Sequence, residues 1–174
     1  MLGLGLGLAV GVSAGNWPSW RGDLAGSGLA KGETVPLKWD TEKNVRWRVP
    51  LPDRGNSSPI VWGDKVFITQ ATDADKRRTV MCFDKRTGEL LWRNGVSYAK
   101  KETTHKTNPY CSGSPATDGR IVVANFASAG IAAYDLGGEQ LWHRDLGPQV
   151  HEWGSSTSPV LFGGDTGPRI GPRR

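Results

Sequence analysis

The stretches FDKRTGELLW (residues 83–92) and YDLGGEQLW (residues 134–142) repeat one pattern about fifty residues apart. Each places an aromatic residue and an Asp before a Gly-bearing turn, and each ends in Leu-Trp. An Asp carboxylate is well placed to accept backbone N–H groups in a tight turn, and Gly supplies the left-handed conformation that the turn demands. We therefore interpret both stretches as the last hairpin of a repeated unit. This assigns structural roles to Asp84, Gly88, Trp92, Asp135, Gly138 and Trp142.

The segments before these hairpins repeat as well. SSPIVWGDKVFIT begins at Ser57, SPATDGRIVVANF at Ser114, and a third start, SPVLFGGD, at Ser158. Pro is tolerated at the first position of a strand, so Ser-Pro can open one. In the first copy we expect further strands at 65–69, 79–83 and 90–92, with a polar loop at 72–78. Four antiparallel strands of this length make one blade of a β-propeller.

A Trp near the outer strand explains how such blades would pack. A single four-stranded sheet cannot bury both of its faces, so neighbouring blades must cover each other. A Trp ring buries on the order of 200 Å² and can fill the wedge between two blades. We assign this role to Trp92 and Trp142, and we expect Trp47 to lie on an outer strand of another blade.

These repeats predict an all-β fold, a partial β-propeller with about two complete four-stranded antiparallel blades plus pieces of others. The expected organisation is a signal-peptide remnant (1–14), an N-terminal segment with an outer strand near Trp47 (15–56), a blade (57–97), an inter-blade loop (98–113), a second blade (114–147), the start of a third (148–164) and a basic tail without a second strand (165–174). Repeat units share their stability with their neighbours, so we expect a fragment of marginal stability.

Composition and charge narrow the class of protein. The 174 residues include 24 Gly, 11 Pro and 8 Trp, which favours short strands joined by turns over a helical bundle. The formal net charge is +5, but the basic residues are scattered, which argues against nucleic-acid binding. The short basic runs at 76–78 and 100–101 are expected to be solvated loop faces.

The N-terminus predicts export. Residues 2–12 are apolar and are followed by small residues up to Ala14, as in the hydrophobic core and cleavage site of a secretory signal. The stretch is too short to span a bilayer. We therefore expect a periplasmic or extracellular protein without a transmembrane span.

The repeated pattern Ser-Ser-Pro followed by Asp-x-x-x-Gly-x-x-x-Trp resembles the repeats of the pyrroloquinoline-quinone-like (quinoprotein-type) β-propellers. That superfamily includes quinoprotein alcohol dehydrogenases and the lipoprotein propeller that assists outer-membrane protein assembly. NWPSWRG at residues 16–22, HKTNPYCSGSPATDGR at 105–120 and LWHRDLGP at 141–148 look like exported repeat proteins of planctomycete type. The usual ring of seven or eight blades implies that this chain is a fragment.

The resemblance implies functions of different classes. We favour a non-enzymatic binding or scaffolding propeller of the bacterial envelope; part of a quinone-dependent oxidoreductase and a carbohydrate-binding propeller are the alternatives. Quinoprotein dehydrogenases combine adjacent cysteines in a disulfide, acidic and amide Ca²⁺ ligands and a catalytic Asp. Cys82 and Cys111 are not adjacent, and two independent thiols are favoured. We predict no catalytic residue, no metal and no cofactor, with pyrroloquinoline quinone and calcium expected only under the oxidoreductase alternative.

The remaining candidates lie in the connections before the Ser-Pro starts. Both connections are expected on one rim of the propeller, where they could meet a small ligand or an envelope protein. Histidines in separate loops are a sparse metal-ligand set, so loop capping is favoured for them over metal binding. The candidate rim residues are Arg54, Asn56, His105, Asn108, Tyr110, His151, Glu152 and Trp153. The pairs Ser57-Ser58 and Ser155-Ser156 are expected to bond backbone groups, because neither pair sits in a nucleophile elbow.

Overall fold

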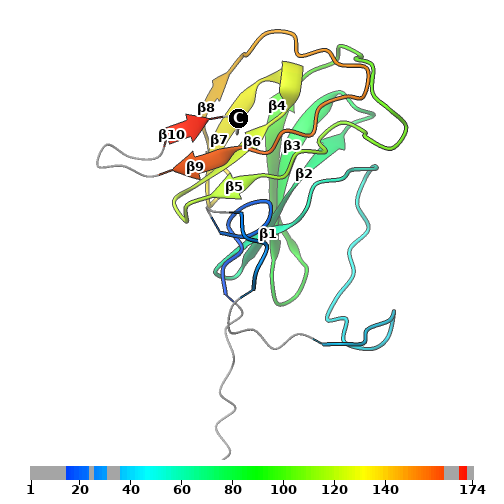
Figure 1. Cartoon of the computed structure of the whole chain (residues 1–174), viewed down its shortest axis with the longest axis vertical. Coiled ribbons are helices and arrows are strands. Elements are labelled where there is room, and N and C mark those ends of the chain that lie inside the picture. The colour runs from blue at the N-terminus through cyan, green and yellow to red at the C-terminus, as the bar shows by residue number, and fades with distance from the viewer. Residues whose placement is uncertain (1–14, 24–25, 31–35, 163–168, 172–174) are drawn as a thin grey trace, which may run out of the picture.

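The structure is a computed structural model that describes residues 15–23, 26–30, 36–162 and 169–171. Its core consists of two four-stranded antiparallel sheets, each with its strands in sequence order (Figure 1). The first sheet contains β1 (Ile60–Trp62), β2 (Lys65–Thr72), β3 (Arg77–Asp84) and β4 (Leu90–Ser97). The second contains β5 (Ala116–Thr117), β6 (Ile121–Asn125), β7 (Ile131–Asp135) and β8 (Gln140–Arg144), with the short 3₁₀ turn η1 (Ala127–Ala129) between β6 and β7. The predicted all-β fold of propeller blades is confirmed.

The central hairpin of the first blade is longer than the sequence pattern predicts. β2 runs to Thr72 and β3 starts at Arg77, with Thr72 opposite Arg77. The expected polar loop at 72–78 is therefore reduced to the turn 73–76, in which Asp73, Ala74 and Asp75 all have positive φ. The polar residues were misleading because Thr72 and Arg78, the two ends of the expected loop, are buried although polar.

A third sheet begins after the second blade. β9 (Val160–Phe162) pairs antiparallel with β10 (Arg169–Gly171), and Ile170 lies opposite Leu161. The expectation of a tail without a second strand is therefore wrong, because residues 169–171 form a short strand that pairs with β9. The inner strands β1, β5 and β9 lie in succession (Figure 1), with β5 in contact with both others.

Alternation along the central strands divides the core into layers. On one face of the first blade, Phe67, Val80 and Cys82 join the buried side chains of the second blade, including Val122 and Tyr134. On the opposite face lies a separate cluster of Val66, Ile68, Met81 and Phe83, against which Trp47 packs. The far face of the second blade meets Leu161 of β9. Side chains at successive positions point to opposite faces, so each central strand is buried on both sides.

Trp92 joins the first blade to the turn of the second. Its Nε1 donates to the carbonyl of Leu136 at 3.1 Å, and its ring lies over Gly138, where an added Cβ would approach within 2.6 Å. Its ring centroid is 5.9 Å from that of Phe67 and 6.2 Å from that of Tyr134. A ring of this size in a fully packed wedge contributes both apolar burial and one satisfied N–H.

Trp47 makes the same contact one blade earlier, although it is not on a strand. Its Nε1 donates to the carbonyl of Lys85 at 2.9 Å, and an added Cβ on Gly88 would come within 2.6 Å of the ring. The predicted outer strand near Trp47 is therefore wrong, because the segment around it pairs with no strand in the described residues. The position of the ring over the next turn, rather than strand pairing, is what the repeat preserves.

Candidate functional site

The carboxylates of Asp84 and Asp135 accept hydrogen bonds within their own hairpin turns. The Oδ1 of Asp84 accepts from the backbone N–H groups of Arg86 and Thr87 at 2.8 and 2.7 Å. These bonds, that from Thr87 first, hold the pKa of Asp84 below its ordinary value. The Oδ1 of Asp135 accepts from the amide of Glu139 at 2.8 Å and from that of Gly137 at 2.9 Å. The Oδ1 atoms of both carboxylates therefore serve as acceptors for the backbone of their own turns.

The Ser-Pro starts of the three repeats are joined by a ladder of side-chain hydrogen bonds. The amide of Ser58 donates to the hydroxyl of Ser114 at 2.8 Å, and the amide of Ser114 donates to the hydroxyl of Ser158 at 3.0 Å. Ser57 accepts from the amide of Thr69 at 3.0 Å. The serines therefore satisfy backbone groups at the starts of the repeats, and Ser57 behaves as the sequence predicted.

A cleft of about 460 Å³ opens along this ladder. We call it the serine cleft; within the part of the chain that the structure describes, none of the side chains that line it is charged. Its lining residues are Ser19, Trp20, Asn56, Asn108, Ser112, Ser114, Ser156, Thr157, Ser158, Pro159 and Val160. Two of the predicted rim residues, Asn56 and Asn108, thus reach one cleft from different connections.

The two amides are oriented in the same way. Asn56 donates through Nδ2 to the carbonyl of Thr107 at 2.7 Å, and Asn108 donates through Nδ2 to the carbonyl of Trp153 at 2.6 Å. Only the NH₂ group of an amide can donate to a carbonyl, so these bonds fix which side of each amide faces away. Both bonds also tie the connection of one repeat to that of the next.

A second group of predicted residues gathers around Trp153. The ring centroids of His105 and Trp153 are 4.6 Å apart. The indole Nε1 donates to Glu152 at 3.0 Å, and the backbone amide of Trp153 donates to Nδ1 of His151 at 3.2 Å. The Nδ1 of His105 lies 2.7 Å from the Thr107 hydroxyl. These contacts support a loop, and the sequence expectation of loop-capping histidines agrees with them.

Tyr110 and Arg54 lie apart from both groups. The Tyr110 hydroxyl donates to the carbonyl of Glu102 at 2.8 Å, and its ring covers the guanidinium of Arg78 at 3.8 Å. Arg54 is exposed, and its carbonyl accepts from Gln70 at 3.3 Å. Neither residue lines the serine cleft.

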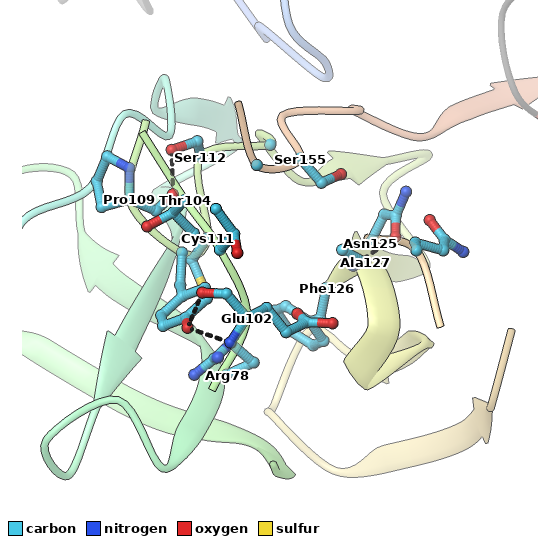
Figure 2. Close-up of a pocket in the computed structure, with 15 residues that line it drawn as sticks. Arg78, Glu102, Thr104, Pro109, Cys111, Ser112, Asn125, Phe126, Ala127 and Ser155 are labelled. Atoms are coloured by element: carbon cyan, nitrogen blue, oxygen red, sulfur yellow. Dashed lines mark hydrogen bonds between the residues drawn. The ribbon is translucent and has the colours of Figure 1, made fainter. Parts of the chain in front are cut away.

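Arg78 overturns the expectation that the basic run 76–78 is solvated. Its side chain is 2% exposed, and it lines a crevice of about 20 Å³ between the two blades. Figure 2 shows Arg78, Glu102 and Cys111 in this crevice, with Phe126 on the side of the second blade. Arg78 alternates with Val80 and Cys82 on β3, so extending the period of two back along the strand would have placed it inside.

The crevice fits a water molecule rather than a larger ligand. A volume of this size is close to that of one water, which needs several polar partners. Nη2 of Arg78 has no hydrogen-bond partner in the described residues, whereas Nη1 donates to the carbonyl of Asp75. Burial raises the pKa of the Cys111 thiol to about 12, although the Arg78 guanidinium acts in the opposite direction. The thiol is therefore protonated and unreactive at neutral pH.

The described residues do not fit a quinone–calcium pair. Calcium prefers sets of carboxylate and carbonyl oxygens, but the serine cleft contains no carboxylate. No group of three or more His, Cys, Asp or Glu residues is close enough to hold a metal within the described ranges. Cys82 and Cys111 are both buried free thiols.

Comparison with known proteins places these features in a family. Residues 10–166 match the family described as outer membrane protein assembly factor BamB. The chain is also similar to a polyvinylalcohol dehydrogenase of Pseudomonas sp., with 26% identity over 149 residues. That alignment covers 81% of this chain and 21% of the relative, so the chain spans about a fifth of the relative's length. In the parts of the chain that the structure describes, no helix is long and apolar enough to cross a membrane.

Proposed function

Because the chain belongs to the PQQ-type β-propeller repeat family described as outer membrane protein assembly factor BamB, we propose that it is a binding module of the bacterial envelope that performs no chemistry of its own. The observation that carries this proposal is the serine cleft, in which the described lining residues are all uncharged. General acid–base catalysis needs a titratable group within hydrogen-bonding reach of the reacting atom. A cleft of this size lined by hydroxyls, amides and apolar side chains is suited to holding a ligand.

The occupant that we propose is a small ligand that enters the cleft at the rim. Asn56 and Asn108 lie on different connections and line the same cleft, so a single ligand can contact both repeats. An envelope protein that docks on the adjacent loop around Trp153, which is 54% exposed, is the alternative occupant of the rim.

Part of a quinone-dependent oxidoreductase is the second candidate. The similarity to a polyvinylalcohol dehydrogenase favours it. In that case these blades would contribute to the scaffold of a longer protein, and the cofactor ligands would come from other parts of it, because the described residues supply no suitable set.

A reconstitution experiment separates the two candidates. The purified chain is titrated with pyrroloquinoline quinone and Ca²⁺ while Trp fluorescence is followed, and alcohol-dependent reduction of an artificial electron acceptor is then measured. We expect no saturable quenching and no reduction. A quinoprotein dehydrogenase reconstituted in the same buffer is the positive control. Calcium-dependent quenching together with dye reduction would replace the binding module with the oxidoreductase.

Residence in the envelope is tested separately. Residues 1–14 lie outside the described residues, so the proposal depends on their apolar sequence. Fusion of residues 1–30 to an alkaline phosphatase that lacks its own signal should give active phosphatase in bacterial cells, because that enzyme requires an oxidising compartment for its disulfides. The same fusion with the substitutions Leu6→Asp and Leu8→Asp should show no phosphatase activity. Equal activity of the two fusions would contradict export through this segment.

A further inference from the structure

We infer that the serine cleft binds a neutral saccharide, with sugar hydroxyls on the Ser, Thr and Asn side chains and a sugar ring face on Trp20. This inference rests on the proposed function and names the class of ligand for the same site. It follows from the charge, the hydrogen-bonding groups and the apolar surface of the cleft.

The uncharged lining of the cleft selects a neutral ligand. Among the described residues, none of the side chains that line it is titratable. The guanidinium of Arg21 lies 5.7 Å from the centroid of the Trp20 ring but is not part of this lining. An ionised ligand that enters loses its hydration and finds no opposite charge to replace it, which is costly. A neutral ligand with polar groups loses less, provided that each group finds a partner.

The unused hydrogen-bonding groups are both acceptors and donors. The Nδ2 groups of Asn56 and Asn108 donate hydrogen bonds to loop carbonyls, so the Oδ1 atom of each amide remains available as an acceptor. The hydroxyls of Ser114 and Ser158 already accept from backbone amides, so their O–H groups remain available as donors. The hydroxyl of Thr157 makes no hydrogen bond to the described residues. A hydroxyl both donates and accepts, so adjacent hydroxyls of a sugar match this mixed set.

The same ladder disfavours a peptide as the occupant. A peptide that adds to a sheet edge needs free backbone N–H groups on that edge. At the edge of the cleft the amides of Ser58 and Ser114 already donate to serine hydroxyls of the next repeat. Along the first two repeats the cleft therefore offers side-chain groups in place of these backbone amides.

The apolar part of the lining suits a sugar ring. Trp20 is 46% exposed and lines the cleft together with Pro159 and Val160. An indole offers a broad apolar face and a polar N–H at its edge, and the C–H face of a pyranose is also apolar. The volume of about 460 Å³ falls within the range of roughly 300–1,000 Å³ that is typical of small-ligand sites.

Calorimetric titration of the chain with defined sugars tests the inference. The probes are the neutral disaccharides maltose, cellobiose and N,N′-diacetylchitobiose, with digalacturonic acid as the anionic counterpart. We expect at least one neutral disaccharide to bind with a dissociation constant of about 1 mM or below, and digalacturonic acid to bind at least about tenfold more weakly. If no neutral disaccharide binds, or if the anionic sugar binds equally well, the inference is wrong.

Matched variants locate the binding. Thr157→Val keeps the shape and removes one hydroxyl, and should weaken binding about tenfold. Trp20→Ala should abolish detectable heat, whereas Trp39→Ala removes an exposed indole that does not line the cleft and should leave binding unchanged. Unchanged far-UV circular dichroism verifies that each variant is folded. If Trp39→Ala weakens binding as much as Trp20→Ala, the site is not the serine cleft and the inference is overturned.

A vinyl-alcohol oligomer separates ring recognition from simple hydroxyl recognition. It carries many hydroxyls but no ring face, so we expect it to bind more weakly than the best disaccharide. Binding of the oligomer without binding of any sugar would overturn the saccharide assignment. The dye-reduction experiment decides the proposed function independently, so a failure to bind sugars leaves the non-enzymatic binding module standing.

Discussion

The contact between Trp92 and Gly138 predicts that Gly138→Ala destabilises the protein more than its backbone conformation alone would. Gly138 has φ of 93°, and a left-handed conformation costs an L-residue about 1–2 kcal/mol. An added Cβ would also come within 2.6 Å of the Trp92 ring, and overpacking costs typically about 1–3 kcal/mol. We therefore expect the free energy of unfolding to fall by about 2–5 kcal/mol in total.

Gly63 provides the matched control. It also has positive φ, at 58°, in a tight hairpin turn, but an added Cβ there would meet no atom within 4 Å. Gly63→Ala should therefore show only the conformational cost of about 1–2 kcal/mol. Both variants are compared with the parent chain in urea titrations followed by circular dichroism, with sucrose added equally to all samples to extend the folded baseline.

A double-mutant cycle isolates the steric part. Replacing Trp92 by Leu removes the ring that Gly138→Ala would strike, so the combined variant should lose about 1–3 kcal/mol less than the sum of the single losses. If Gly138→Ala costs no more than Gly63→Ala, or if the two changes are additive, the ring does not seat on this turn and the argument for blade packing fails.

Three further predictions use other contacts. Ser114→Ala leaves the backbone amide of Ser58 in the preceding repeat without its acceptor, and the free energy of unfolding should fall by about 1–3 kcal/mol in urea titrations. Thr103→Val, which removes the hydroxyl of an exposed residue of the inter-blade loop, is the control and should change it little. Burial raises the pKa of both Cys82 and Cys111 to about 12. Ellman's reagent at pH 8 should therefore modify neither thiol in the folded chain and both thiols in urea. Rapid labelling of the folded chain would refute this prediction. The pKa of Asp84 is lowered, chiefly by the hydrogen bond from the backbone N–H of Thr87. The stabilisation that Asp84 gives is therefore present above the ordinary Asp pKa of about 3.9 and is lost as the pH falls below that value. Asp84→Asn should flatten the acid side of the plot of unfolding free energy against pH, and an unchanged plot would contradict the assignment.

Several parts of the fold follow from local chemistry and were therefore readable in the sequence. The Asp-Gly turns needed only a short carboxylate and a residue that tolerates positive φ, as at Asp84 and Gly88. The resemblance to PQQ-type propellers depended on the spacing of such turns relative to Trp92, and the family match agrees with it. The length of the turn at 73–76 was not predicted, because polar residues such as Thr72 and Arg78 can be buried when their blade is covered by another.

The candidate site was predicted only in part. Asn56 and Asn108 were selected as rim residues, and both line the serine cleft. Trp20, Thr157 and Ser158 line the cleft too, but their sequence context suggested only a strand start or an N-terminal segment. No local sequence pattern distinguishes such residues, because the cleft is formed between residues of consecutive repeats.

The sequence by itself determined the repeat, its turns and its all-β class, because these depend on residues that lie within a few positions of each other. Only the tertiary structure decided that Trp47 seats on Gly88 without forming a strand, that Arg78 is buried under Tyr110, and that the serines of successive repeats form a ladder. These contacts join positions about 30 to 60 residues apart. They are set by how one blade packs against the next, which no local pattern of residues specifies.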